Sequence, residues 1–300
     1  MEKRSIGIIG LGNMGRNVAK RLHSEGHGLV IYNRTREKYG QFRNMENIYL
    51  SDGLEDFMQA LRKKGHEVVI WMMLPGGEVT NAMIAKLSGI LEKGDVLIDA
   101  SNAKYTDSVA NYETLKKKSV FYLDVGCAGG PDDLAEGVSL MVGGDRVAYR
   151  KVEDIFRVIA GAGTYGYVGG SGAGQMTKLI HNGIFYGIFP IYVEGVELLM
   201  KANESAGGGL DLKEALRLLA ASPPITRDIM DSILKVIEDG ALPSAAPKAK
   251  VSDVIIWETE MAGRLGVSFD ATRAVLGKYG SISEESRRLY AAAKKRITGH

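Results

Sequence analysis

Apolar and polar positions follow two different periods along the first half of the chain. Short β-rich apolar runs, typical of strands buried on both faces, are separated by longer runs with the helical period. The predicted strands are Ser5–Ile9, Leu29–Tyr32, Val68–Met73, Val96–Asp99, Val120–Asp124, Ser139–Val142 and Thr164–Val168. The predicted helices are Met14–Ser24, Glu37–Gln41, Leu54–Lys64, Glu78–Leu87, Tyr105–Lys117 and Asp145–Ile159. Strands joined through helices need crossover connections, so we expect an α/β fold with a doubly wound, mostly parallel sheet.

The pattern changes after Gly170, where no strand signal remains. Residues from Ala173 to about Lys201 predict one long helix with few polar interruptions. Further predicted helices are Leu212–Ala220, Ile225–Glu238, Lys248–Leu265, Phe269–Gly277 and Glu284–Arg296, with a loop at Gly240–Lys250. We therefore expect an α/β domain at 1–169 followed by an all-α domain at 170–300, built on the long helix.

The long predicted helix is apolar on most sides, so most of its surface must be buried. The short helices that follow it provide little area to cover it. We expect burial against a second copy of the chain, as a homodimer or a dimer of dimers. A self-contained helical domain is the alternative.

Composition excludes several classes of protein. Charged residues make up 25% of the 300 residues, apolar residues 45%, and the net charge is +2. A net charge this small gives no strong electrostatic attraction to nucleic acid or to a membrane surface. The chain has no run of 18 apolar residues, so we expect no membrane span. The start of the chain, Met1 to Arg4, does not resemble a signal peptide. With one cysteine, Cys127, the chain fits a reducing compartment, so we expect a cytoplasmic protein without a metal site.

The strongest motif is a glycine turn between the first predicted strand and the first predicted helix. Its residues, each a candidate cofactor contact, are Gly10, Leu11, Gly12, Asn13, Met14 and Gly15. In a strand–turn–helix context, this spacing is the fingerprint of dinucleotide binding in a Rossmann domain. The first glycine permits the turn, the second lets backbone approach the pyrophosphate, and the third lets the helix pack on the strand. A purely structural glycine turn is the alternative.

The end of the second strand indicates which nicotinamide cofactor binds. NAD sites usually place a carboxylate there for the ribose 2′-hydroxyl, whereas this chain has Asn33, Arg34 and Thr35. Arg34 offers a planar fork of donors to a phosphate, so NADP is expected rather than NAD. Ordinary solvated charge is the alternative for Arg34 and for Arg36.

Two further strand ends carry candidate residues. Leu74 and Pro75, in a turn after the third long strand, are expected to pack on the cofactor, and a plain helix-start turn is the alternative. Asn102 follows the next strand, where it would bind the cofactor carboxamide or substrate. Its alternative role is to cap the helix that begins near Tyr105.

Lys178, His181 and Asn182 share one side of the long predicted helix, because residues three and four apart are neighbours. Removing hydride from an alcohol requires a group that takes the hydroxyl proton, and a lysine depressed by burial can do so. Asn182 would hold the hydroxyl or the lysine in line, and His181 would donate to a substrate oxygen. A lysine that snorkels from a core helix is the alternative.

The remaining candidates are weaker. The small residues Ala128, Gly129 and Gly130 follow a strand, and backbone N–H groups in such a loop can bind a carboxylate. Cys127 beside them is expected to be a small filler rather than a reactive thiol. Arg227 lies at the start of a predicted helix, an unfavourable place for a cation unless an anion is near. A surface arginine is its alternative.

Together these motifs resemble the short-form 6-phosphogluconate dehydrogenases of the β-hydroxyacid dehydrogenase superfamily. The resemblance covers about two thirds of the chain. The residues on which the resemblance rests are Gly10–Gly15, Asn33–Thr35, Met73–Gly77, Asn102, Gly129–Gly130 and Gly172–Gly174, which leads to Lys178–Gly187. Histidine before the asparagine distinguishes this family from its 3-hydroxyisobutyrate relatives.

The resemblance implies oxidation of 6-phosphogluconate at C3 with NADP or NAD, followed by loss of CO2 to give ribulose 5-phosphate. This is a step of the pentose phosphate pathway and of gluconate utilisation. It also implies a lysine that acts as base and then acid, a dimer built around the long helix, and Arg227 as the phosphate-binding arginine.

Two positions depart from the family pattern. Ala128 stands where the family has serine, and Phe185 stands where the family has the glutamate that protonates the enediol. Tyr186 or water would have to replace that acid. The alternatives are therefore a non-decarboxylating β-hydroxyacid dehydrogenase or aldehyde reductase and, third, a silent dinucleotide-binding protein.

Overall fold

The structure is a computed structural model that describes residues 4–65, 67–129 and 137–222, with isolated positions between 235 and 292. The chain divides into two compact units, Met1–Ile184 and Phe185–His300. The first unit holds the sheet and every site residue whose side chain is discussed below.

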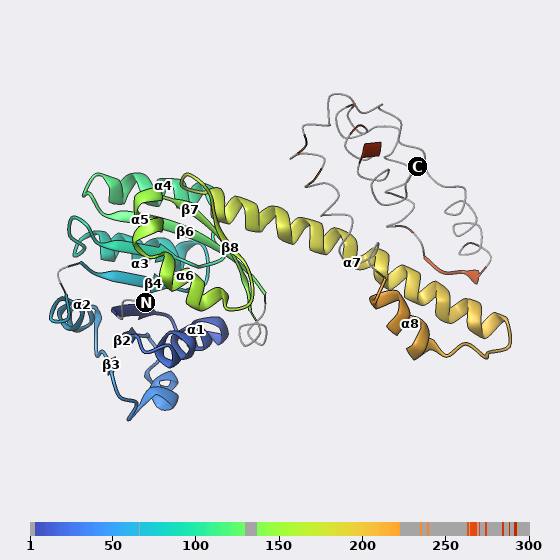
Figure 1. Cartoon of the computed structure of the whole chain (residues 1–300), viewed down its shortest axis with the longest axis horizontal. Helices are drawn as coiled ribbons and strands as arrows, with labels where there is room; N and C mark the ends of the chain where they lie inside the picture. Colours follow the sequence, from blue (N-terminus) through green and yellow to red (C-terminus); the bar gives the residue numbers. More distant parts are fainter. Residues whose placement is uncertain are drawn as a thin grey trace. The chain divides into compact units, whose positions relative to one another are not determined.

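The first unit is built on one eight-stranded sheet with the order β3-β2-β1-β4-β5-β6-β7-β8 (Figure 1). The strands are β1 (Ser5–Ile9), β2 (Gly28–Tyr32), β3 (Ile48–Leu50), β4 (Val69–Met72), β5 (Val96–Asp99), β6 (Phe121–Ala128), β7 (Ser139–Gly144) and β8 (Tyr165–Gly169). Strands β1 to β6 are parallel, β7 is antiparallel to β6, and β8 is parallel to β7. This confirms the doubly wound, mostly parallel sheet.

Helices cover both faces of this sheet (Figure 1). They are α1 (Asn13–Ser24), the 3-10 helix η1 (Arg36–Phe42), α2 (Leu54–Arg62), α3 (Glu78–Ser88), α4 (Tyr105–Lys116), α5 (Arg146–Lys151) and α6 (Glu153–Ala160). Side chains alternate along the strands, so that Ile8 of β1 joins one hydrophobic core and its neighbour Ile9 the other. Residues of α1, η1, α5 and α6 complete the first core, and residues of α2, α3 and α4 complete the second. Burial on both faces explains why the strands read as continuous apolar runs.

Three elements differ from the sequence prediction. The edge strand β3 was not expected, because three residues give too short an apolar run to detect. Strand β6 continues four residues beyond Asp124, because Val125 to Ala128 pair with β7 in antiparallel register; tertiary pairing here overrides weak strand propensity. The single helix expected at 145–159 is broken at Val152, which has φ −122° and ψ 17°.

The long helix is confirmed as α7 (Ala173–Ser205), followed by α8 (Leu212–Ala220). Asp211 caps α8 by accepting a hydrogen bond from the Glu214 N–H at 3.0 Å. The other elements expected in the second half lie outside the continuous described residues. They are the helices at 225–238, 248–265, 269–277 and 284–296 and the loop at 240–250.

The start of α7 is fixed to the carboxyl end of the sheet. The buried Asp124 carboxylate on β6 accepts the backbone N–H groups of Gly172 at 2.7 Å and Gln175 at 2.9 Å. A Cβ at Gly174 would lie 2.3 Å from the carbonyl oxygen of Asp124, so only glycine allows this approach. One buried carboxylate on β6 and one glycine therefore set where the long helix begins.

Replacing Asp124 with alanine removes both acceptors at the start of α7. Losing a helix cap costs about 1–2 kcal/mol, which for a domain of this size corresponds to a fall in Tm of roughly 2–8 °C. Asp124→Asn keeps one side-chain oxygen and should lose less. Thermal unfolding followed by circular dichroism compares the variants, and an alanine variant as stable as the original chain would contradict this anchoring role.

Candidate functional site

The glycine turn after β1 has the geometry that its sequence predicts. Gly10 has φ +100°, and a Cβ there would lie 2.3 Å from the carbonyl oxygen of Met73. A Cβ at Gly15 would lie 2.2 Å from the Gly10 carbonyl oxygen, whereas a Cβ at Gly12 would meet nothing within 4 Å. Gly10 and Gly15 are thus required by packing inside the protein. Gly12, which precedes the first residue of α1, instead leaves open space at the helix N-terminus, where an anion is favoured.

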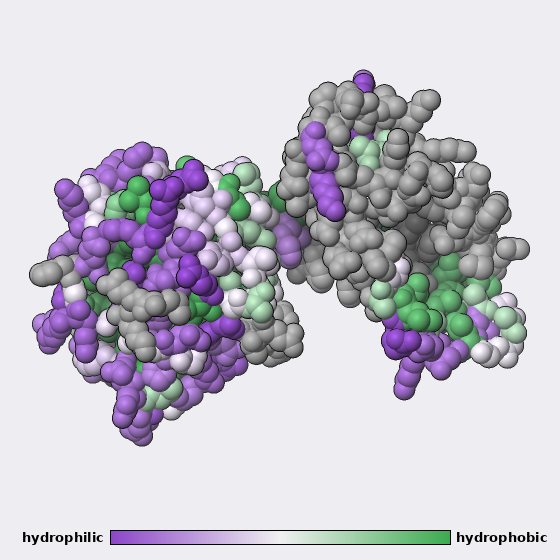
Figure 2. Space-filling view, viewed as in Figure 1, coloured by the Kyte–Doolittle hydropathy of each residue, from purple (hydrophilic) through white to green (hydrophobic). Residues whose placement is uncertain are grey.

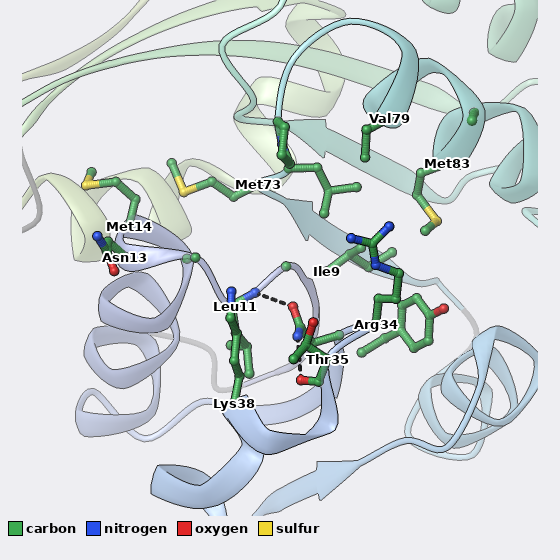
Figure 3. Close-up of a pocket in the computed structure, with 18 of the residues that line it drawn as sticks. Ile9, Leu11, Asn13, Met14, Arg34, Thr35, Lys38, Met73, Val79 and Met83 are labelled. Carbon is green, nitrogen blue, oxygen red and sulfur yellow. Dashed lines mark hydrogen bonds between the residues drawn. The ribbon is translucent and has the colours of Figure 1, made fainter.

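This turn forms the floor of a cleft of about 790 Å³. All of the predicted cofactor residues except Asn102 line it, namely Gly10, Leu11, Gly12, Asn13, Met14, Gly15, Asn33, Arg34, Thr35, Leu74 and Pro75. Asn33 also braces the cleft from within. Its side-chain oxygen accepts the Leu11 N–H at 2.9 Å, and its amide group donates to the Thr35 carbonyl at 2.7 Å (Figure 3).

Two cations line the cleft beyond β2. Arg34 is exposed there and reaches toward Met83 of α3 (Figure 3), and Lys38 on η1 lines the same cleft. Arg36 differs, because its guanidinium pairs with the Asp52 carboxylate at 3.1 Å, which agrees with the solvated-charge alternative. Sequence reasoning missed Lys38, although a lysine four residues after Arg34 was a usable signal.

The facing wall of the cleft comes from the turn after β4 and from α3. Leu74 and Pro75 line the cleft, and the same turn leads directly into α3, whose preceding residue is Gly77. The turn is therefore a helix start whose residues also line the cleft, and its packing on the cofactor stays a prediction. Glu78 in the first turn of α3 also lines the cleft and was not among the predicted residues.

A second cavity of about 330 Å³ adjoins this cleft and shares Met14, Met73 and Leu74 with it. Its other lining residues come from three different elements and the turns that follow them: Ala100, Ser101, Asn102, Cys127, Gly129, Gln175, Lys178 and Asn182. The fold therefore brings the candidate catalytic residues Lys178 and Asn182 next to the glycine-turn cleft. Ser101 and Gln175 are additions that the sequence did not single out.

Lys178, His181 and Asn182 are neighbours on α7, as their spacing predicts. The Lys178 Nζ lies 3.4 Å from Nδ1 of the exposed His181, which in turn lies 3.3 Å from Oδ1 of Asn182. Partial burial lowers the pKa of the Lys178 amine, and the Cys127 thiol acts in the opposite direction. A lysine with a lowered pKa is a candidate proton acceptor.

Lys178 packs directly on β6. A Cβ at Gly126 would lie 2.4 Å from the Lys178 Cβ, so glycine is needed where α7 crosses the strand. Burial raises the pKa of the neighbouring Cys127 thiol to about 11. Cys127 is therefore a neutral thiol at physiological pH, which fits the prediction of a small filler.

The remaining candidates have different outcomes. Asn102 does not cap α4, because that helix begins at Tyr105 and Lys104 is the preceding residue; it is exposed and lines the second cavity. Ala128 is the last residue of β6 rather than part of a loop, and Gly129 follows it with φ +132°. Gly130 and Arg227 lie outside the described residues, as do the side chains of Phe185 and Tyr186.

Neither a metal site nor a membrane span is found within the part of the chain that the structure describes. No group of three or more histidine, cysteine, aspartate or glutamate side chains there is arranged to hold a metal ion. No helix there combines the length and the apolar character needed to cross a membrane.

Comparison with known proteins places the chain among nicotinamide-dependent enzymes. The family profile described as the NAD binding domain of 6-phosphogluconate dehydrogenase matches residues 5–169. The NAD(+)-dependent, decarboxylating 6-phosphogluconate dehydrogenase of Bacillus subtilis (strain 168) is 38% identical over 202 residues, which cover 65% of this chain and 42% of that protein. The decarboxylating 6-phosphogluconate dehydrogenase of Staphylococcus aureus (strain N315) is 31% identical over 300 residues, covering 95% of this chain and 63% of that protein.

The chain thus spans less than two thirds of the length of these curated relatives. Among solved structures, a reductive aminase from Aspergillus terreus in complex with NADPH and ethyl levulinate superposes with a TM-score of 0.70 at 18% identity, covering all of both chains. At this identity the likeness concerns the fold alone. The profile match over the glycine turn, the cleft and the whole sheet is decisive, and the chain belongs to the 6-phosphogluconate dehydrogenase family, a family of dinucleotide-binding oxidoreductases.

Proposed function

We propose that this protein oxidises 6-phosphogluconate with NADP and decarboxylates the product to ribulose 5-phosphate, with Lys178 as general base and then acid. The observation that carries the proposal is the position of Lys178, in a cavity that shares three residues with the glycine-turn cleft. An amine of lowered pKa next to a dinucleotide cleft fits the oxidation of a hydroxyl group.

The cleft residues fit a dinucleotide on structural grounds. The open space over Gly12 admits a pyrophosphate against the free N–H groups at the start of α1. Asn13 and Met14 continue that N-terminus, and Leu74 and Pro75 form the opposite wall. A bound nicotinamide cofactor would accept the hydride from the substrate carbon. Asn102, on the second cavity, is assigned to the end of the site where the carboxamide and substrate meet.

We assign the cofactor preference to Arg34 and Lys38, together with Thr35 and the backbone that Asn33 braces. The two exposed cations can pair with a 2′-phosphate, and the residue that ends β2 is Tyr32, followed by no carboxylate before Glu37. The Aspergillus terreus structure holds NADPH. The Bacillus subtilis relative is named for NAD. Because these two proteins differ in cofactor, the proposed preference for NADP rests on this chain's own cations.

The proton chemistry is assigned to α7. The neutral Lys178 amine takes the proton of the substrate hydroxyl as the carbonyl forms, and the resulting ammonium then polarises that carbonyl. Asn182, adjacent on the same face, orients the hydroxyl. His181, whose ring lies 3.4 Å from the lysine nitrogen, donates to a substrate oxygen.

The substrate-binding residues are assigned in part from the end of β6 and in part from the family resemblance. Gly129 and Gly130, after Ala128, offer backbone N–H groups to the substrate carboxylate, and Tyr186 and Arg227 are assigned to the substrate as the family resemblance implies. We accordingly assign residues 1–169 to cofactor binding and residues 170–300 to substrate binding and dimerisation.

Dimerisation is supported by apolar surface on the long helix. Met176, Leu179 and Ile180 on α7 are 46%, 57% and 59% exposed. In the second unit, Leu218 and Leu219 of α8 are also exposed, and a hydrophobic patch is visible there (Figure 2). Apolar side chains at this density are typical of surfaces covered by a partner. A second copy of the chain is the proposed partner, as a homodimer or a dimer of such dimers.

A second candidate function keeps the hydride transfer and omits the decarboxylation. Ala128 and Phe185 favour it, since alanine gives no hydroxyl to the substrate and phenylalanine cannot protonate an enediol. The enzyme would then be a non-decarboxylating β-hydroxyacid dehydrogenase or aldehyde reductase, as in 3-hydroxyisobutyrate dehydrogenases.

Replacing Arg34 with alanine should raise the KM for NADP by roughly 10- to 100-fold, the value of a charged hydrogen bond, and change the KM for NAD less than about twofold. Lys38→Ala should act in the same direction. Arg36→Ala is the matched control, because Arg36 already pairs with Asp52. Steady-state kinetics with both cofactors give the answer, and an unaltered NADP to NAD ratio in both variants would remove these cations from the site.

Replacing Lys178 with methionine should abolish turnover and leave NADPH affinity, measured by fluorescence titration, within about twofold. In the unaltered enzyme, kcat/KM should rise with pH as Lys178 loses its proton, and level off below the ~10.4 of a free lysine, because burial lowers its pKa. Retained turnover in Lys178→Met, or a rate that falls as the pH approaches this range from below, is incompatible with a lysine base.

The carbon balance separates the two candidate reactions. With 6-phosphogluconate and NADP, the proposed reaction releases one CO2 for each NADPH formed, which is measured by trapping CO2 while following absorbance at the NADPH band. NADPH without CO2, together with a retained keto acid, would establish the second candidate instead.

A further inference from the structure

Gln175 is a buried polar side chain for which the chemistry proposed above has no use. It is 2% exposed and lies one turn before Lys178 on α7. Its amide nitrogen donates to the carbonyl oxygens of Ser101 at 2.7 Å and Val125 at 3.1 Å, and its backbone N–H donates to Asp124. A primary amide has two N–H donors, and both are used here, one on the turn after β5 and one on β6.

The two carbonyls belong to segments that carry site residues. Ser101 immediately precedes Asn102, after the end of β5, and Val125 lies on β6 two residues before Cys127. Gln175 itself lines the cavity with Asn102 and Lys178. One side chain therefore connects the start of α7 to the two segments of the sheet that contribute residues to the cavity.

The contact of α7 with β6 is close at Lys178. A Cβ on Gly126 would lie only 2.4 Å from the Lys178 Cβ, so the two segments can approach this closely only because residue 126 is glycine. If the start of α7 moved outward, Lys178 would leave this contact and gain water, and its amine would regain an ordinary pKa. A displacement of about 1 Å in a reacting group costs on the order of 100-fold in rate.

We propose that Gln175 is a positioning residue, whose two amide hydrogen bonds hold the start of α7 against the turn after β5 and against β6 and so fix Lys178 relative to Asn102. The proposal rests on the proposed role of Lys178 as the base. Asp124 fixes the backbone of the helix start, and Gln175 adds the connection to β5 that Asp124 does not make.

The test is the substitution Gln175→Met, which keeps length and apolar volume and removes both donors. Gln175→Asn is a milder second variant, since its shorter amide cannot span both carbonyls. Gln59→Met, at an exposed position on α2, is the matched control. The first readout is the pH dependence of Lys178 acylation by trace acetic anhydride, quantified by peptide mass spectrometry, which requires no substrate and no turnover.

Among the described residues, the titratable groups that face Lys178 are Cys127 on β6 and His181 on α7, and the buried Asp124 lies on the strand that holds the start of the helix. The pH range of the labelling should therefore extend from 6 to above 10. We expect the Lys178 pKa to move toward ~10.4 in Gln175→Met and Gln175→Asn and to stay unchanged in Gln59→Met.

The second readout is steady-state kinetics at a fixed interval below the Tm of each variant. We expect kcat to fall roughly 10- to 100-fold in Gln175→Met while NADPH affinity stays within about twofold. An unchanged Lys178 labelling pKa in both Gln175 variants would overturn the positioning role, whatever their stability. Absence of turnover in the unaltered enzyme would instead count against the proposed function, and labelling would still decide the role of Gln175.

Discussion

The site depends on how the start of α7 is held against the buried strand β6. Helix N-termini leave backbone N–H groups without partners, and here two of them point at the Asp124 carboxylate. Burial raises the pKa of this carboxyl group above its ordinary value, the charge of Asp99 adds to the rise, and the two N–H bonds oppose it. The helix therefore supplies the donors that the buried carboxylate needs, and the carboxylate supplies the acceptor that the helix lacks.

This exchange of hydrogen bonds requires that helix and sheet approach at backbone distance. Gly126, Gly143 and Gly174 lie at the crossing, and a Cβ on any of them would lie within 2.7 Å of an atom of the facing segment. Glycine weakens strands and helices elsewhere. Here its lack of a side chain allows Lys178 to pack on β6 and lie beside a cavity rather than in bulk water.

The sequence predicted the sheet, the long helix and the glycine-turn cleft, because each leaves a periodic or local signal. Lys178, His181 and Asn182 could be grouped for the same reason, since helical spacing alone makes them neighbours. Gln175 could not be found this way: its role depends on carbonyls 50 and 74 residues away. The extension of β6 through Ala128 was likewise invisible, because it depends on pairing with β7 and not on local propensity.

The environment of Lys178 is what distinguishes a base from a structural cation. A lysine beside a carboxylate would be held as ammonium. The buried carboxyl groups of Asp99 and Asp124 accept hydrogen bonds from Tyr122 and from backbone N–H groups, and neither is among the groups that shift the pKa of Lys178. The group that acts on the Lys178 amine is the Cys127 thiol, which burial keeps neutral. Among the residues that the structure describes, no carboxylate pairs with Lys178, so its proton affinity is set there by burial and by whatever the adjoining cleft binds.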